Sequence, residues 1–202
     1  MPRVAGQIDQ AKRAAVLDAA SAVMGEKGLS ASMEEIARRA GVSKQTIYNH
    51  YGCKARLIVA LTDRRVHELT APLAAPEAAD QPEEALAAFS EALLTASVSP
   101  ARTAFMRLVI EGASDLPDVA RALYAAGHQA TRSRLADFLR QEHAAGRLTV
   151  ADPARAAEFF IGMTMGSYQT AGLLGVERPL SEAQAAEIAR DAAARFVRAY
   201  AV

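Results

Sequence analysis

The sequence predicts an all-α protein of about nine helices, with an N-terminal three-helix domain at residues 9–69 and a C-terminal helical domain at residues 82–202. The 202 residues are 51% hydrophobic, which is enough to bury a sizeable core. Abundant alanine with only 5% aromatic residues favours closely packed helices over sheets. Signals that start and stop helices recur along the whole chain and divide it as follows.

Residues 32–54 predict two short helices joined by a tight turn. Ser32 can cap the first helix, and Glu35 three residues later can complete a capping box. The apolar residues that follow recur at helical spacing and form one stripe, comprising Met33, Ile36, Ala37 and Ala40, with Glu34, Arg38 and Arg39 on the solvent side. Gly41 can adopt the positive φ that commonly follows the end of a helix. A short, rigid turn therefore follows this helix.

The second helix of the pair is expected to begin after Ser43, which can cap it, while Val42 packs on Ile47 as a hydrophobic staple. Its outward side chains are nearly all able to donate hydrogen bonds: Lys44, Gln45, Thr46, Tyr48, Asn49 and His50. Such a face suits the base edges and phosphates of a DNA major groove. The two helices therefore predict a helix-turn-helix that binds DNA.

Further helices are expected along the rest of the chain. A fourth helix should run from Lys54 to the helix breaker Pro72, followed by a loop rich in proline and alanine at residues 71–82. Later helices are expected from residue 82 to about 97, from Ser99 and Pro100 onward, from 117 to about 143, from 152 to about 174, and from 181 to about 200. Ser181 and Gln184 provide a second capping box for the last of these.

Residues 159–176 carry no charged side chain over 18 positions, long enough to consider a membrane span. Because glycine, serine, threonine and glutamine interrupt the segment, we expect no membrane span but a helix that is buried on every side. One face would pack in the domain core and the other on a second subunit, with the final helix as its partner. The expected four-helix dimer interface comprises Phe159, Gly162, Gly166, Thr170, Ile188, Ala192 and Phe196.

Charge is unevenly distributed although the chain has no net charge, with 23 basic and 23 acidic residues. Residues 1–67 carry 11 basic and 6 acidic side chains, net +5, and include all four lysines, whereas residues 68–202 are net −5. A basic N-terminal part attracts phosphates, and the affinity of such an interaction falls steeply with salt. The distribution predicts that nucleic acid binds at one end of the molecule.

The sequence contains no recognisable catalytic or metal-binding motif. Its four histidines have no metal-binding spacing, and neither a G-x-S-x-G motif nor a phosphate-binding glycine loop is present. We therefore expect neither enzymatic activity nor a cofactor. A single cysteine excludes an intramolecular disulfide and residues 1–3 open without an apolar signal core, so a cytoplasmic location is expected.

Residues 16–65 resemble the DNA-binding region of the TetR family of bacterial transcriptional regulators. The matching positions are Val16, Leu17, Ala20, Val23, Met24, Gly28, Ser32, Ile36, Ala37, Ala40, Gly41, Val42, Ser43, Ile47, Tyr48, His50, Tyr51 and Lys54. The resemblance implies an all-helical homodimer whose C-terminal domain binds an effector and sets the distance between two DNA-binding domains. It also implies that Lys54, in the first turn of the fourth helix, binds phosphate. The chain departs from the family pattern at Cys53, where a small polar cap is usual, and at the acidic Glu34.

Two sets of binding residues follow from these patterns and from the resemblance. The expected DNA-binding residues are Ser32, Ser43, Lys44, Gln45, Thr46, Tyr48, Asn49, His50 and Lys54. The candidate effector pocket comprises Phe105, Met106, Ile110, Tyr124, His128, Phe160, Met163 and Tyr168, for each of which an ordinary core role is the alternative. Their chemistry favours a small apolar or aromatic effector with one or two hydrogen-bonding groups.

The resulting functional hypothesis is a ligand-responsive homodimeric repressor that binds a roughly palindromic DNA operator. Activation instead of repression remains an alternative, because the two differ only in operator position. A redox response is a second alternative, since Cys53 lies at a helix N-terminus beside Lys54, a setting that favours a reactive thiol. Control by a protein partner is a third.

Overall fold

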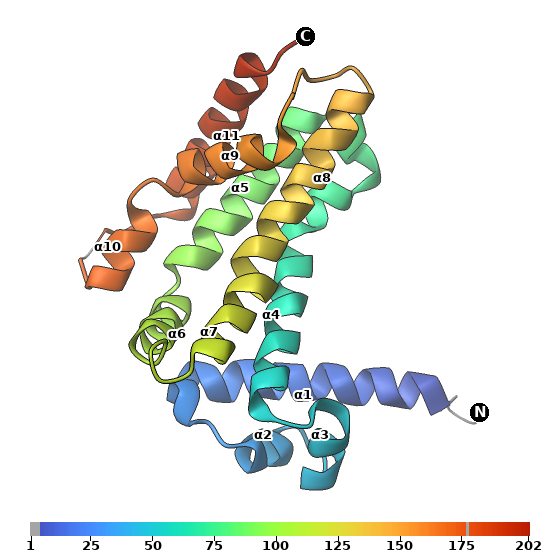
Figure 1. The fold of residues 1–202 in the computed structure, drawn as a ribbon, viewed down its shortest axis with the longest axis vertical. Helices are drawn as coiled ribbons and strands as arrows, with labels where there is room; N and C mark the ends of the chain where they lie inside the picture. Colours follow the sequence, from blue (N-terminus) through green and yellow to red (C-terminus); the bar gives the residue numbers. More distant parts are fainter. Residues whose placement is uncertain (1–4, 177) are drawn as a thin grey trace. The chain divides into compact units, whose positions relative to one another are not determined.

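The computed structural model describes residues 5–176 and 178–202 and contains helices and no strand within them, which confirms the expected all-α class (Figure 1). The helices form two compact units. The first unit comprises the chain up to Arg64 together with Ala104–Leu123, and the second comprises Arg65–Thr103 with Tyr124–Val202. This grouping differs from the sequence boundaries because Ala104–Leu123, distant in sequence, packs with the N-terminal helices.

The first unit is built from α1 (Ala5–Lys27), α2 (Met33–Arg39), α3 (Lys44–Tyr51), most of α4 (Lys54–Thr70), most of α6 (Pro100–Glu111) and α7 (Pro117–Tyr124). A 3-10 turn, Gly28–Ser30, follows α1. The core contains the fully buried side chains of Ile36, Ile47 and Leu57, one each from α2, α3 and α4. Leu123 of α7 is buried in the same cluster. The helix-turn-helix therefore has a core of its own, to which α7 contributes.

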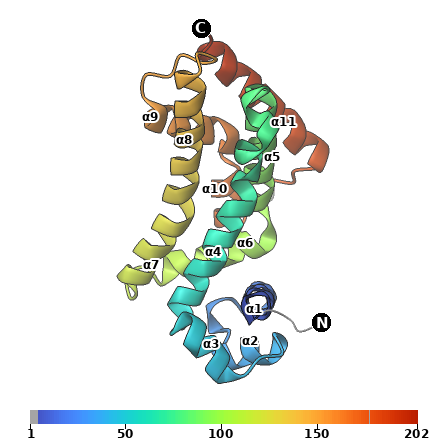
Figure 2. The same ribbon diagram turned by 90° about the vertical axis from the view of Figure 1, so that its right-hand side faces the viewer.

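The second unit contains the end of α4 and the first turn of α6 together with α5 (Pro82–Val98), α8 (Ala130–Ala144), α9 (Pro153–Met165), α10 (Tyr168–Leu174) and α11 (Glu182–Ala199). In this unit α11 packs along α5, and α8 packs on α9 (Figure 1, Figure 2). Phe160 of α9 lies between two other buried rings, 6.3 Å from Phe89 of α5 and 5.0 Å from Phe196 of α11, measured between ring centroids. These three aromatic side chains tie the helices of the unit together.

Several expected helix boundaries are confirmed. The helix from residue 117 to about 143 is present, with α7 continuing into α8 through a π turn, Ala125–Gln129. The capping box of Ser181 and Gln184 begins α11, and two short 3-10 turns occupy part of the expected loop before Pro82. Ser99 was expected to start the helix that contains Pro100. Instead, its hydroxyl donates a hydrogen bond to the carbonyl oxygen of Ala96, at the end of α5.

The prediction of a single helix from residue 152 to about 174 is wrong. Gly166 adopts φ 47° and ψ −129° and ends α9, and α10 begins separately at Tyr168. Residues with a side chain rarely adopt this backbone conformation, so the glycine permits the break. Within the described residues, no helix has the length and apolar character needed to cross a bilayer.

Candidate nucleic-acid interface

The first helix of the helix-turn-helix begins with the expected capping box. Ser32 Oγ accepts a hydrogen bond from the Glu35 backbone N–H at 3.1 Å, and the Ser32 backbone N–H donates to a Glu35 carboxylate oxygen at 3.0 Å. Glu35 also pairs with Lys27 at the end of α1. The hydrogen bond from Lys27, followed by that from the Ser32 backbone, lowers the pKa of Glu35 to about 2. The carboxylate therefore stays ionised and joins α2 to the end of α1.

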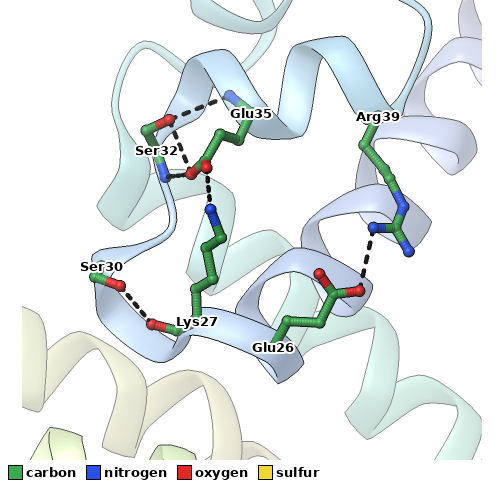
Figure 3. A network of polar contacts seen from close by, with 6 residues as sticks. All are labelled: Glu26, Lys27, Ser30, Ser32, Glu35 and Arg39. Carbon is green, nitrogen blue, oxygen red and sulfur yellow. Dashed lines mark hydrogen bonds and ion pairs between the residues drawn. The ribbon is translucent and has the colours of Figure 1, made fainter.

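Two further contacts fix the same junction (Figure 3). Arg39 at the end of α2 pairs with Glu26 of α1 at 3.1 Å, and the Ser30 hydroxyl donates to the Lys27 carbonyl oxygen at 2.7 Å. The pair between Arg39 and Glu26 is solvent exposed, and such pairs stabilise little individually. Together with the capping box, these contacts fix the orientation of α2 relative to α1 at both ends of α2.

The turn and the start of α3 also follow the expected geometry. Gly41 has φ +66°, the left-handed conformation that glycine adopts without strain. Ser43 Oγ accepts from the Thr46 backbone N–H at 3.0 Å and so caps α3. Because Ile47 and Tyr51 are buried, the opposite face of this eight-residue helix points to solvent.

The solvent face of α3 carries the expected hydrogen-bonding side chains. Lys44, Gln45, Tyr48, Asn49 and His50 are exposed, and Thr46 is half-buried. The Gln45 side-chain amide donates a hydrogen bond to the side-chain amide oxygen of Asn49 at 2.7 Å, one helical turn further on. This bond limits the rotamers of both amides before any DNA is bound. Gln45 keeps its amide oxygen and a second N–H, the acceptor and donor with which a glutamine can recognise adenine.

Lys44 is paired with Glu34 of α2, a contact that the sequence spacing did not reveal. The hydrogen bond between them raises the pKa of Lys44 and lowers that of Glu34. The Lys44 ammonium also lies 5.7 Å from the centroid of the Tyr48 ring. Glu34 is exposed as expected, but it neutralises the first basic side chain of α3. To contact a phosphate, Lys44 has to exchange this carboxylate for the DNA.

Lys54 is the first residue of α4, immediately after the exposed Cys53. Its side chain is partly buried, and this desolvation lowers the pKa of Lys54. An ammonium beside the N–H groups that open a 17-residue helix is a favourable place for a phosphate.

Ser32 and Ser43 use their hydroxyls to cap α2 and α3. The DNA contacts of all nine expected residues remain predictions, but all nine lie in the first unit.

The residues expected at the dimer interface differ in exposure. Phe159 is 58% exposed, and Gly162, Gly166 and Thr170 are exposed too. Ile188 is half-buried, whereas Ala192 and Phe196 are buried in the core of their own subunit. The last two are therefore corrected to core residues, because the outward face of α11 lies elsewhere on the helix.

The candidate pocket residues do not gather in one unit. Phe105, Met106 and Ile110 belong to the first unit and the remaining five to the second. Phe160 is corrected to a core residue, since it is fully buried between Phe89 and Phe196. Tyr124 and Met163 are 53% and 45% exposed. Of the eight candidate pocket residues, only Phe160 is completely buried in the core.

A separate groove of about 560 Å³ lies between α8 and α9 of the second unit, and it contains none of the expected pocket residues. Ion pairs line it: Arg132 with Glu158 at 3.3 Å, Arg155 with Asp152 at 3.5 Å, and Arg140 with Asp137. Because every charge in these pairs is balanced, the groove has little electrostatic selectivity for an ion.

A helix-turn-helix whose second helix presents hydrogen-bonding side chains to solvent is typical of DNA-binding transcriptional regulators. Residues 16–61 match the family described as bacterial regulatory proteins of the tetR family. Residues 84–202, more than half of the chain, match the C-terminal domain of AefR-like transcriptional repressors. The chain belongs to the TetR family.

Individual relatives agree with this assignment. The chain is 37% identical over 90 residues to the regulator BetI of Rhizobium meliloti, covering 44% of this chain and 43% of BetI. It is 44% identical over 59 residues to the transcriptional activator FasR of Mycolicibacterium smegmatis, covering 29% of this chain and 27% of FasR. The matches thus span less than half of the length of these curated relatives.

Solved structures extend the similarity to nearly the whole chain. A TetR-family regulator from Mesorhizobium loti has a TM-score of 0.74 and 24% identity, covering 96% of this chain and 98% of that one, which shows the shared fold. The flavonoid-responsive regulator FrrA has a TM-score of 0.68 and 31% identity, covering 94% of this chain and 97% of its own.

Proposed function

We propose that this protein is a ligand-responsive homodimeric repressor that acts in the cytoplasm on a roughly palindromic operator. The exposed hydrogen-bonding face of α3 supports the DNA-binding step more directly than any other observation. The match of the C-terminal residues to AefR-like repressors supports the direction of control. Two α3 helices of a dimer would enter successive major grooves, roughly 34 Å apart.

Exposed apolar side chains on α9 support the proposed dimer. Phe159 and Met163 are four residues apart, so they share one face of the helix, and both are about half exposed. Gly162 and Gly166 near them would allow a second helix to approach closely. An exposed apolar face of this kind is stabilised when a partner subunit covers it. A monomer in light scattering at micromolar concentration would contradict the proposal.

An apolar or aromatic effector is proposed to release the protein from DNA. FrrA, which is similar over nearly the full chain, is described as flavonoid-responsive, and flavonoids are aromatic. The effector would act by binding better to a subunit arrangement in which the two α3 helices have the wrong spacing. Only this difference in affinity between two states is needed.

Activation is the second candidate function, because FasR is described as an activator and is 44% identical over 59 residues. That match covers only 27% of FasR, so it supports the direction of control less than the C-terminal family match does. The redox alternative requires Cys53, which is exposed. Unchanged operator affinity after peroxide treatment would exclude it. A response to a protein partner would be indicated if no small molecule shifted the melting temperature.

Footprinting of the protein on the intergenic DNA upstream of its own gene tests the proposal. We expect two protected half-sites about one helical turn apart. Gln45→Ala should weaken protection, whereas Gln141→Ala, which removes an exposed amide from α8 in the second unit, should not. A single protected half-site, or equal loss of protection in both variants, would contradict the proposed mode of binding.

A further inference from the structure

Arg102, in the first turn of α6, is a partly buried cation without a counter-charge in the part of the chain that the structure describes. Its guanidinium makes no hydrogen bond or ion pair with any described residue. Burial, and then the charge of Arg65 on α4, lower the pKa of Arg102. A guanidinium offers five donors, and leaving them partly desolvated without a partner costs free energy. Partly desolvated ionisable groups of this kind are concentrated at binding and catalytic sites.

His128 and Arg132 lie near Arg102, on the helix formed by the π turn and α8. Partial desolvation, followed by the charges of Arg102 and Arg132, lowers the pKa of His128. Arg132 itself pairs with Glu158 at 3.3 Å. No carboxylate is among the groups that shift the pKa of Arg102 or His128. Arg102 therefore supplies the excess positive charge here, and all three residues lie within the second unit.

An aromatic surface lies beside these cations. The Tyr124 ring stacks on the His128 imidazole with centroids 5.7 Å apart and an angle of 12° between the planes. The Tyr124 hydroxyl accepts a hydrogen bond from Arg132 at 3.3 Å, and the residue remains 53% exposed. His128 lies in the π turn Ala125–Gln129, and such turns occur frequently at functional sites. The π turn thus places a flat, partly uncovered aromatic pair at the positive group.

We propose that Arg102, with His128 and Tyr124, forms the polar end of the effector site and binds the carboxylate of a planar aromatic acid. The forked guanidinium of Arg102 matches the two oxygens of a carboxylate, and an aromatic ring can stack on Tyr124. This inference rests on the proposed function, since it specifies the effector of a ligand-responsive regulator. It replaces a generally apolar effector with one that carries a negative charge.

Isothermal titration calorimetry with cinnamate and with its neutral amide, cinnamamide, tests the charge requirement on the full-length protein. We expect cinnamate to bind and the amide to bind at least tenfold more weakly, because only the carboxylate satisfies Arg102. Inorganic phosphate serves as a second probe. Equal binding of acid and amide would overturn the proposal, and so would phosphate binding with no response to cinnamate.

Arg102→Met tests the residue, and Arg155→Met is its matched control. Methionine preserves an unbranched apolar stem, and Arg155 is an exposed arginine of α9 paired with Asp152. We expect Arg102→Met to weaken cinnamate binding about ten- to hundredfold and to leave the unliganded melting temperature unchanged or higher. A fall in melting temperature with unchanged cinnamate affinity would show a structural role and overturn the proposal.

The same protein also separates this inference from the proposed function. Cinnamate binding that depends on Arg102 without release of operator DNA would support the anion site and contradict the ligand-responsive mechanism. Operator release by a neutral aromatic compound, with no cinnamate binding, would support the mechanism and overturn the anion site.

Discussion

Gly28 provides a quantitative test of how α6 packs in the first unit. This residue begins the 3-10 turn after α1 with φ +58°, and a Cβ there would lie 2.3 Å from Cδ1 of Leu108 on α6. Adding a Cβ in the left-handed region costs roughly 1–2 kcal/mol. Displacing the terminal methyl of a half-exposed leucine adds about 1 kcal/mol, at the low end of overpacking costs. Gly28→Ala should therefore lower the free energy of unfolding by about 2–3 kcal/mol.

Two other glycines separate the contributions. Gly41 has φ +66° but no atom within 4 Å of its added Cβ, so Gly41→Ala should show the backbone cost alone, roughly 1–2 kcal/mol. Gly25 lies inside α1 with open space around its added Cβ, and Gly25→Ala should stabilise by about 0.5–1 kcal/mol. Removing Leu108 together with Gly28 should relieve the steric part, so the two substitutions should not be additive.

Urea denaturation followed by circular dichroism at 222 nm measures these differences. The order of stability should be Gly25→Ala, wild type, Gly41→Ala and then Gly28→Ala. If Gly28→Ala were no less stable than Gly41→Ala, Leu108 would not pack on this turn and the reasoning would be refuted. Additive effects of Gly28→Ala and Leu108→Ala would lead to the same conclusion.

Three further predictions concern stability. Ser32→Ala should lower the free energy of unfolding by about 1 kcal/mol in urea denaturation, because α2 loses its N-cap; no change would contradict the capping role. Phe160→Ala should cost about 3–5 kcal/mol by removing the ring between Phe89 and Phe196, and a cost below about 1 kcal/mol would contradict its burial. Because the folded-state pKa of Glu35, about 2, lies below its ordinary 4.5, its stabilising contribution is complete above pH 4.5 and is lost as the pH falls toward 2. Acid titration of stability should therefore be flatter in Glu35→Gln, and identical curves would contradict the pairing with Lys27.

Local signals were enough to predict the helix-turn-helix in detail. The capping boxes of α2 and α11, the cap at Ser43 and the positive φ of Gly41 depend on residues at most three positions apart. Because both partners of each contact lie close to each other in the sequence, their spacing alone predicts the contact. The solvent face of α3 follows from the same helical period once Ile47 is placed in the core.

Contacts between distant residues were not predictable in this way. Glu34 and Lys44 meet only because the turn brings α2 and α3 together. Phe196 was expected at a subunit interface, since its apolar stripe on α11 does not distinguish the subunit's own core from a partner's surface. The break at Gly166 was missed because glycine at helical spacing is equally compatible with close helix packing. Each of these features depends on tertiary structure.

The most direct test of the account is the salt dependence of binding to the upstream intergenic DNA, measured by fluorescence anisotropy for wild type and Lys54→Ala. We expect tight binding to this DNA over a scrambled sequence, with log K falling linearly as log[salt] rises. If each Lys54 of a dimer neutralises one phosphate, Lys54→Ala should reduce the steepness of this slope by about 1.8. Equal affinity for both DNAs, with the same slope in the variant, would contradict the assignment of α3 and the start of α4 as a sequence-specific DNA-binding surface.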